Sequence, residues 1–276
     1  KDSLLYAVGI GAGTDDLAFT TENSMDITQR AYPTQVVVLG ENSGAFANIG
    51  TFNPAMLVHG EQAFTLHREL PVAGTVSTTS EVTAVWDKTK GAVVEVTFRS
   101  VTPDGEPLFD KVMSVYIRGE GDFGGERGPS GPQNVAPDRA PDAEVTYPTR
   151  VDQALLYRLS GDRNPLHSDP SFAELAGFDR PILHGLCTYG FTGRALLGAL
   201  CGDDPARFRS MAGRFSSPVF PGEGLTVRIW NVGDGEALYR THGDDDRVVL
   251  DAGKATFDTA YRPGGPACWA PSPPPG

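Results

Sequence analysis

The sequence predicts an α+β protein made of two similar halves, each with an antiparallel sheet. Two observations favour this class. Runs rich in Val and Thr, with partial alternation and turn residues between them, occur in both halves and are typical of strands. One longer segment, Leu186–Leu200, is apolar nearly all round and has glycines at 190, 193 and 198. That pattern predicts a buried helix with something packed closely against it.

Three strands are predicted in each half. Turn signals at Asp87–Gly91 and Pro103–Gly105 separate those of the first half. The expected ranges are Thr75–Trp86, Ala92–Thr102 and Pro107–Ile117, then Leu225–Val232, Ala237–His242 and Val248–Phe257.

A repeated order of parts suggests an ancient duplication: a His-Gly pair, a Pro-Val…Gly turn, then strands. Gly60 and Gly74 lie 14 positions apart, whereas Gly185 and Gly222 lie 37 apart. The extra length holds the predicted helix, and a long buried helix wrapped by an antiparallel sheet is the hot-dog arrangement. The spacing therefore predicts a tandem double hot dog whose first half has a shortened or lost helix. The uncovered sheet face there should form an apolar tunnel for a ligand chain.

The domain organisation follows from composition. Residues 119–148 are dense in Gly, Pro, Asp and Arg with almost no apolar periodicity, which predicts a linker. We therefore expect an N-terminal hot-dog-like domain over 1–118 and a C-terminal catalytic domain over 149–262. The proline-rich residues 263–276 are predicted to be a disordered tail.

The bulk properties exclude several classes. A net charge of −12 argues against a nucleic-acid surface, and no apolar run is long enough for a membrane span. The 3 cysteines are too few and too scattered for a disulfide framework or a zinc site, which fits a reducing compartment. Arginine outnumbers lysine, so we expect a bacterial cytoplasmic protein. A peroxisomal setting is expected only if the chain is a domain excised from a eukaryotic protein.

The most informative stretch holds Asp162, Asn164 and His167 within six residues, and His184-Gly185 follows at a predicted helix start. A carboxylate, an imidazole and backbone N–H groups at a helix N-terminus can move protons beside a developing oxyanion. Alone, the first three residues could be only a polar turn, and His184-Gly185 only a helix cap. A metal site from His59, His167 and His184 has little support from spacing, and a nucleotide loop at Gly9–Gly13 lacks a βαβ unit.

These motifs resemble a known family. Gly161–Pro170 and Pro181–Thr188 look like the signature of the MaoC-like (R)-specific enoyl-CoA hydratases, which include the hydratase 2 unit of peroxisomal multifunctional enzyme type 2. Further matches follow in order along nearly the whole chain, at Leu5–Ala12, Leu57–Gln62, Gly121–Gly125 and Arg214–Val219. The resemblance implies the same double hot dog.

The resemblance also implies site residues. Asp162 and His167 would form the acid–base pair with Asn164 in the same site, and the Gly185 N–H would donate to the thioester oxygen. Substrate contacts are expected from His59, Gly60, Lys88, His184 and Phe215. Plainer interpretations stay open: Lys88 as a hairpin-turn lysine, Phe215 as a core aromatic, and His59-Gly60 as a relic of the duplication.

The implied reaction is reversible hydration of a trans-2-enoyl-CoA to the (3R)-3-hydroxyacyl-CoA in fatty-acid metabolism. No metal, nucleotide or redox cofactor is expected. The protein is expected to form a homodimer. Two alternatives remain at this level. One is a dehydratase for thioesters of acyl carrier protein, which would want a basic docking patch. The other is a non-catalytic acyl-CoA-binding module, for which an acid–base pair would be unnecessary.

Overall fold

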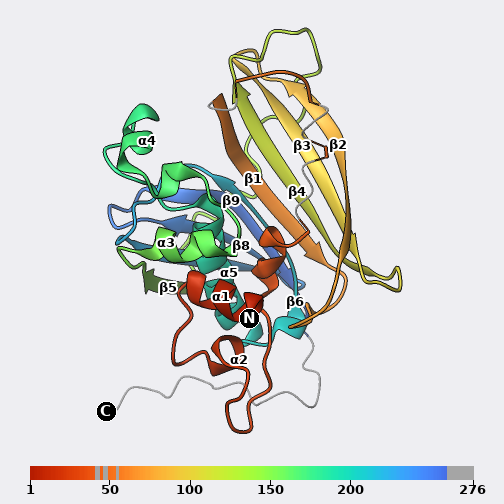
Figure 1. Cartoon of the computed structure of the whole chain (residues 1–276), viewed down its shortest axis with the longest axis vertical. Helices are drawn as coiled ribbons and strands as arrows, with labels where there is room; N and C mark the ends of the chain where they lie inside the picture. Colours follow the sequence, from red (N-terminus) through yellow and green to blue (C-terminus); the bar gives the residue numbers. More distant parts are fainter. Residues whose placement is uncertain (41–43, 46–48, 54–55, 260–276) are drawn as a thin grey trace.

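The computed structural model describes residues 1–40, 44–45, 49–53 and 56–259. Its strands form a single nine-stranded antiparallel sheet in the order β2-β3-β4-β1-β6-β9-β8-β7-β5 (Figure 1). The first half supplies β1 (Leu57–Leu66), β2 (Ser77–Asp87), β3 (Gly91–Val101) and β4 (Pro107–Arg118). The second half supplies β5 (Ala143–Pro148), β6 (Phe208–Phe215), β7 (Gly224–Gly233), β8 (Glu236–His242) and β9 (Val248–Phe257). Pairing of β1 with β6 joins the two halves.

One long helix, α5 (Gly185–Cys201), lies against the sheet of the second half. The other helices are short: α1 (Asp2–Gly9), α2 (Leu17–Thr20), η1 (Pro33–Val38), α3 (Gln153–Tyr157), η4 (Arg158–Ser160), η5 (Pro165–His167), α4 (Pro170–Leu175) and η6 (Pro205–Arg207). The predicted double hot dog is therefore confirmed, with a central helix in the C-terminal half and only short helices in the described part of residues 1–118.

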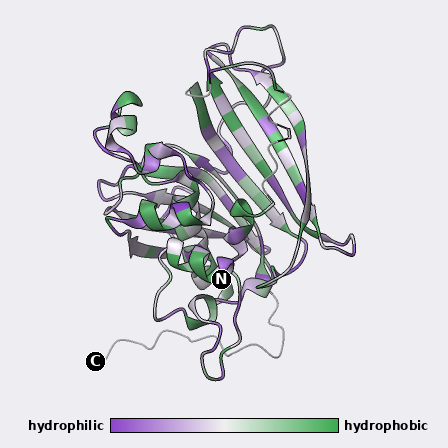
Figure 2. Ribbon diagram, viewed as in Figure 1, coloured by the Kyte–Doolittle hydropathy of each residue, from purple (hydrophilic) through white to green (hydrophobic). Residues whose placement is uncertain are grey.

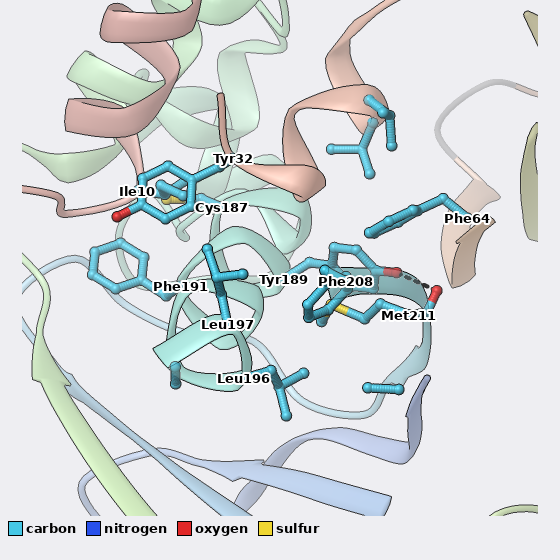
Figure 3. Packing of buried hydrophobic residues seen from close by; sticks show 14 of the residues in the cluster. Ile10, Tyr32, Phe64, Cys187, Tyr189, Phe191, Leu196, Leu197, Phe208 and Met211 are labelled. Atoms are coloured by element: carbon cyan, nitrogen blue, oxygen red, sulfur yellow. Dashed lines mark hydrogen bonds between the residues drawn. The ribbon is translucent and has the colours of Figure 1, made fainter. Parts of the chain in front are cut away.

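Helix α5 is buried because its small residues admit close neighbours. A Cβ at Gly190 would lie 2.4 Å from the side chain of Ile10, and one at Gly193 would lie 2.2 Å from Thr34. The large apolar side chains around α5 form the main core (Figure 3), in which the Tyr189 hydroxyl donates to the Met211 carbonyl at 2.7 Å. The helix ends at Cys201, and Gly202 caps it in the left-handed conformation.

The six predicted strands are all present, with ends shifted by up to two residues. Three strands were not predicted: β1, β5 and β6. Strand β5 occupies the last six residues of the predicted linker and pairs with β7. The linker prediction is therefore wrong over 143–148, although residues 119–142 contain no helix or strand.

The proposed correspondence between Gly60 and Gly185 is also wrong. Gly60 lies inside strand β1, whereas Gly185 begins α5. The short gap after Gly60 therefore holds a strand and not a shortened helix. The described residues of the first half include no long helix, but the duplication cannot be aligned on the His-Gly pairs.

The apolar face of the first half is not open over the described residues. Hydrophilic and hydrophobic residues alternate along these strands (Figure 2), and apolar residues of β3 and β4 form a second core cluster. Ala45, Ile49 and Phe52 pack against that cluster. The predicted tunnel is thus filled at this place by side chains of the same chain.

Within the described ranges, we find no helix with the length and apolar character that a membrane crossing demands. The predicted tail, 263–276, lies outside the described residues.

Candidate active site

Three side chains converge beside the N-terminus of α5. Asp162 comes from the loop between η4 and η5, His167 ends η5, and His184 immediately precedes α5. Each residue offers one nitrogen or carboxylate oxygen, and these three atoms all lie within 4.8 Å of one another. The sequence separates His184 from the other two by a short helix, α4, so the fold brings this group together.

His167 is held with one nitrogen available. Its ring is buried, and its Nδ1–H donates to the carbonyl oxygen of Ile182 at 2.9 Å. Because a carbonyl can only accept, this contact fixes the tautomer and leaves Nε2 free to take a proton. Burial lowers the pKa of His167, and the hydrogen bond to Ile182 and the nearby charge of Asp162 oppose that effect only in part. The ring is therefore neutral at neutral pH, as a general base requires.

Asp162 and Asn164 also shape the turn. The Asp162 Oδ1 accepts the backbone N–H of Asn164 at 3.0 Å, and the Asn164 Oδ1 accepts that of Leu166 at 3.0 Å. Asn164 thereby caps η5, which carries His167. The plainer interpretation as a polar turn is thus correct for the local structure, and the same turn places the carboxylate beside the imidazole.

His184 is nearly inaccessible, with 1% of its surface exposed. Its Nε2–H donates to the main-chain carbonyl of Asp162 at 3.2 Å, and its ring stacks on His167 with centroids 3.8 Å apart. Burial and the neighbouring His167 lower the pKa of His184 to about 4. Such burial leaves little surface for the substrate contact that the resemblance implies.

Gly185, Phe215 and His59 lie beside one another. Gly185 is exposed and is the first residue of α5, where a backbone N–H has no acceptor within the helix. A Cβ there would lie 3.1 Å from the Phe215 ring, which in turn meets His59 edge-on at 5.0 Å. Burial lowers the pKa of His59 to about 4, and the charge of Asp162 acts on it in the opposite direction. The first half therefore contributes His59 to the surroundings of the acid–base pair.

Gly60 lies where the pairing of β1 with β4 shifts register, between His59 and Glu61. A Cβ there would lie 3.3 Å from the Ser114 carbonyl oxygen, so a side chain would disturb the irregularity. Its place in the structure therefore favours a backbone role next to His59.

Lys88 is not brought to this cluster. It lies in the turn between β2 and β3, and β4 separates β3 from β1. Its Nζ donates to the carbonyl oxygens of Arg127 and Pro129, at 2.5 and 2.9 Å. The plainer interpretation, a hairpin lysine, fits this place better.

The Asp162, His167 and His184 group has the residue types of a metal site, but its ring geometry does not suit one. The two rings are stacked, with 29° between their planes. One nitrogen of each ring is also bonded to a main-chain carbonyl oxygen and is not available to an ion. The arrangement fits proton transfer better than coordination.

Two contributors escape sequence reasoning. Ile182 acts through its carbonyl oxygen, which any residue would supply. Tyr157 is buried with its ring centroid 5.1 Å from that of His184, and only its place just before the motif could have suggested a role.

The comparisons with known proteins agree with this fold and show the family. Residues 133–249 match the MaoC like domain, and residues 1–119 match the MFE-2 hydratase 2 N-terminal domain. The 3-hydroxyacyl-thioester dehydratase Y of Mycobacterium tuberculosis is 52% identical over 93% of this chain and 92% of its own. The probable enoyl-CoA hydratase 2 of Dictyostelium discoideum is 40% identical over 94% of this chain and 90% of its own length. The structure of a MaoC-like dehydratase from Phytophthora capsici superposes with a TM-score of 0.85. It is 36% identical, and the match covers 93% of this chain and 91% of that one.

The double hot dog and these family matches together define a hydratase or dehydratase. The chain belongs to the MaoC-like dehydratase and hydratase 2 family. It is a hydro-lyase of the enoyl-CoA hydratase 2 and 3-hydroxyacyl-thioester dehydratase type, which rules out the non-catalytic binding module.

Proposed function

We propose that the protein catalyses the reversible addition of water to a trans-2-enoyl-CoA, giving the (3R)-3-hydroxyacyl-CoA in fatty-acid metabolism. One observation carries this proposal. Asp162 and His167 lie together beside Gly185, an exposed residue at the positive end of a long buried helix. The (R) outcome rests on the resemblance to the (R)-specific hydratases.

The electrostatic part of the reaction falls to Gly185. The thioester carbonyl is conjugated with the alkene, so attack of water at C3 places negative charge on the carbonyl oxygen. A backbone N–H and the helix dipole aimed at that oxygen stabilise the enolate. Because glycine has no Cβ, the thioester can approach the backbone closely.

Proton transfer falls to the Asp162 and His167 pair. Ligand atoms of His167 and Asp162 lie within 4.8 Å of each other, so we expect one water to contact both the His167 Nε2 and the Asp162 carboxylate. One of the two groups takes a proton from the water as the water oxygen bonds to C3. The pair then returns a proton to C2.

A dehydratase acting on thioesters of acyl carrier protein is the second candidate, because the relative from M. tuberculosis is named a 3-hydroxyacyl-thioester dehydratase. Both candidates use the same chemistry and differ in the carrier. The net charge of −12 favours CoA, because acyl carrier proteins are acidic and dock on basic surfaces.

The test compares one acyl group on two carriers. Crotonyl-CoA and crotonyl-acyl carrier protein are hydrated in parallel, and loss of the conjugated enoyl absorbance is followed. We expect a higher kcat/KM with the CoA thioester and a 3R product by chiral analysis. A preference for the carrier protein would overturn the CoA assignment, and a 3S product would overturn the stereochemistry. Sedimentation of the same preparation would test the expected homodimer.

A further inference from the structure

His184 touches both members of the acid–base pair and yet is hidden from the substrate. Its Nε2–H reaches the main-chain oxygen of Asp162, while its ring lies flat against His167. Only 1% of the residue is exposed. A group in this position can influence the reaction only through its neighbours.

His184 is also unsuited to exchange protons. Its Nδ1 is buried and finds no hydrogen-bond partner among the residues that the structure describes. A second proton would therefore place an unpaired N–H, and a charge, in a buried site against another imidazole. The ring stays neutral, with one N–H committed to the Asp162 carbonyl.

We propose that His184 is a positioning residue for the hydration reaction. Its N–H fixes the main chain at Asp162, and its ring fixes the plane of His167. Because His184 also immediately precedes Gly185, one residue ties the acid–base pair to the oxyanion-stabilising end of α5. This inference rests on the proposed function of the same site and differs from the substrate contact that the sequence implies.

Two substitutions test the two contacts of His184 separately. His184→Gln keeps an N–H donor near the position of Nε2 but loses the ring, and His184→Phe keeps a stacked ring but loses the donor. Each should lower kcat for crotonyl-CoA by about 10- to 100-fold, the effect of misplaced catalytic groups, with little change in KM. His67→Gln and His67→Phe are matched controls, because His67 immediately follows β1, pairs with Asp110 and is exposed.

A second measurement is independent of turnover. The pKa of His167 is followed by NMR in wild type and in both variants. In His184→Phe the main chain at Asp162 loses its anchor. The carboxylate is then held less firmly beside His167, its charge stabilises protonated His167 less, and the pKa of His167 should fall further. In His184→Gln the pKa should stay close to the wild-type value.

The outcomes separate the alternatives. A raised KM with unchanged kcat would mean a substrate contact. Loss of one limb of the pH–rate profile in both variants would mean proton transfer by His184. Lower thermal stability with normal turnover per folded molecule would mean a structural role only, and each of these results overturns the inference. If the wild-type protein does not hydrate crotonyl-CoA, the proposed function is overturned instead. The NMR measurement still applies in that case, and an unchanged pKa of His167 in both variants would overturn the positioning role.

Discussion

The ring of Phe215 lies directly over the backbone of Gly185. A Cβ on Gly185 would approach that ring to 3.1 Å, closer than most carbon contacts in proteins. Phe215 ends β6, and Gly185 begins α5. The sheet therefore forms one wall of the place where we expect the thioester oxygen to bind.

Gly185→Ala should consequently impair catalysis more than folding. The new methyl group must displace the Phe215 ring or occupy the space needed by the thioester, so we expect kcat/KM for crotonyl-CoA to fall by about 10- to 1000-fold, as when an oxyanion donor is lost. Gly198→Ala is the control on the same helix, because its Cβ would meet only the flexible side chain of Asp203. Equal activity in both variants would contradict the oxyanion role of Gly185.

Asp162→Asn should nearly abolish hydration. The volume is kept and the Asn164 N–H still finds an acceptor, so only proton transfer and charge are lost. We expect at least about a 100-fold loss in kcat, with product affinity by calorimetry unchanged. Retention of more than about a tenth of wild-type turnover would be incompatible with general acid–base catalysis by this carboxylate.

His167→Ala should behave like Asp162→Asn, and the double variant should be little worse than either. Residues that act as one unit give non-additive losses. Turnover of the three proteins with crotonyl-CoA measures this directly. Losses that multiply would show that the two residues serve separate steps.

Stability should fall on the acid side because of His59 and His184. Burial lowers the pKa of each to about 4, against an ordinary value of 6.5. Between those values the unfolded chain binds protons that the folded protein does not, so the unfolding free energy decreases as pH falls from 6.5 towards 4. Urea unfolding over this range measures the slope, which His59→Gln and His184→Gln should each flatten. An unchanged slope in both variants would show that other groups control the acid limit.

Lys88→Met should leave KM for crotonyl-CoA unchanged. The lysine holds the loop after β4 through the carbonyl oxygens of Arg127 and Pro129, so the expected effect is a small loss of stability, about 1 kcal/mol. Steady-state kinetics and urea unfolding of the same sample separate the two effects. A several-fold rise in KM would restore Lys88 as a CoA contact.

Phe52→Ala should favour longer substrates if the acyl chain enters the first half. Phe52 packs on the apolar cluster of β3 and β4, so its removal opens space where the tunnel was expected. Each additional buried methylene is worth up to ~0.8 kcal/mol, so kcat/KM should rise with chain length relative to wild type. Val85→Ala, at an exposed position of β2, is the control. An unchanged chain-length profile would show that the acyl chain lies elsewhere.

The sequence by itself determined the features that depend on near neighbours. The apolar run of α5 identifies a buried helix, because its apolar character on nearly all sides and its small residues are visible locally. Asp162, Asn164 and His167 fall within one turn, so their proximity follows from covalent connection. Alternation likewise predicted the six hairpin strands.

Only the tertiary structure decided which distant segments meet. Strands β1 and β6 pair across the two halves, and that contact brings His59 to Phe215 and hence to Gly185. Nothing in the spacing of His59-Gly60 distinguishes a strand from a helix start, so the assumed duplication misaligned it. Lys88 and His184 show the same limit, because the burial and partners of a side chain depend on long-range packing. Local patterns therefore predicted the acid–base pair, whereas the register of the central strands decided what surrounds it.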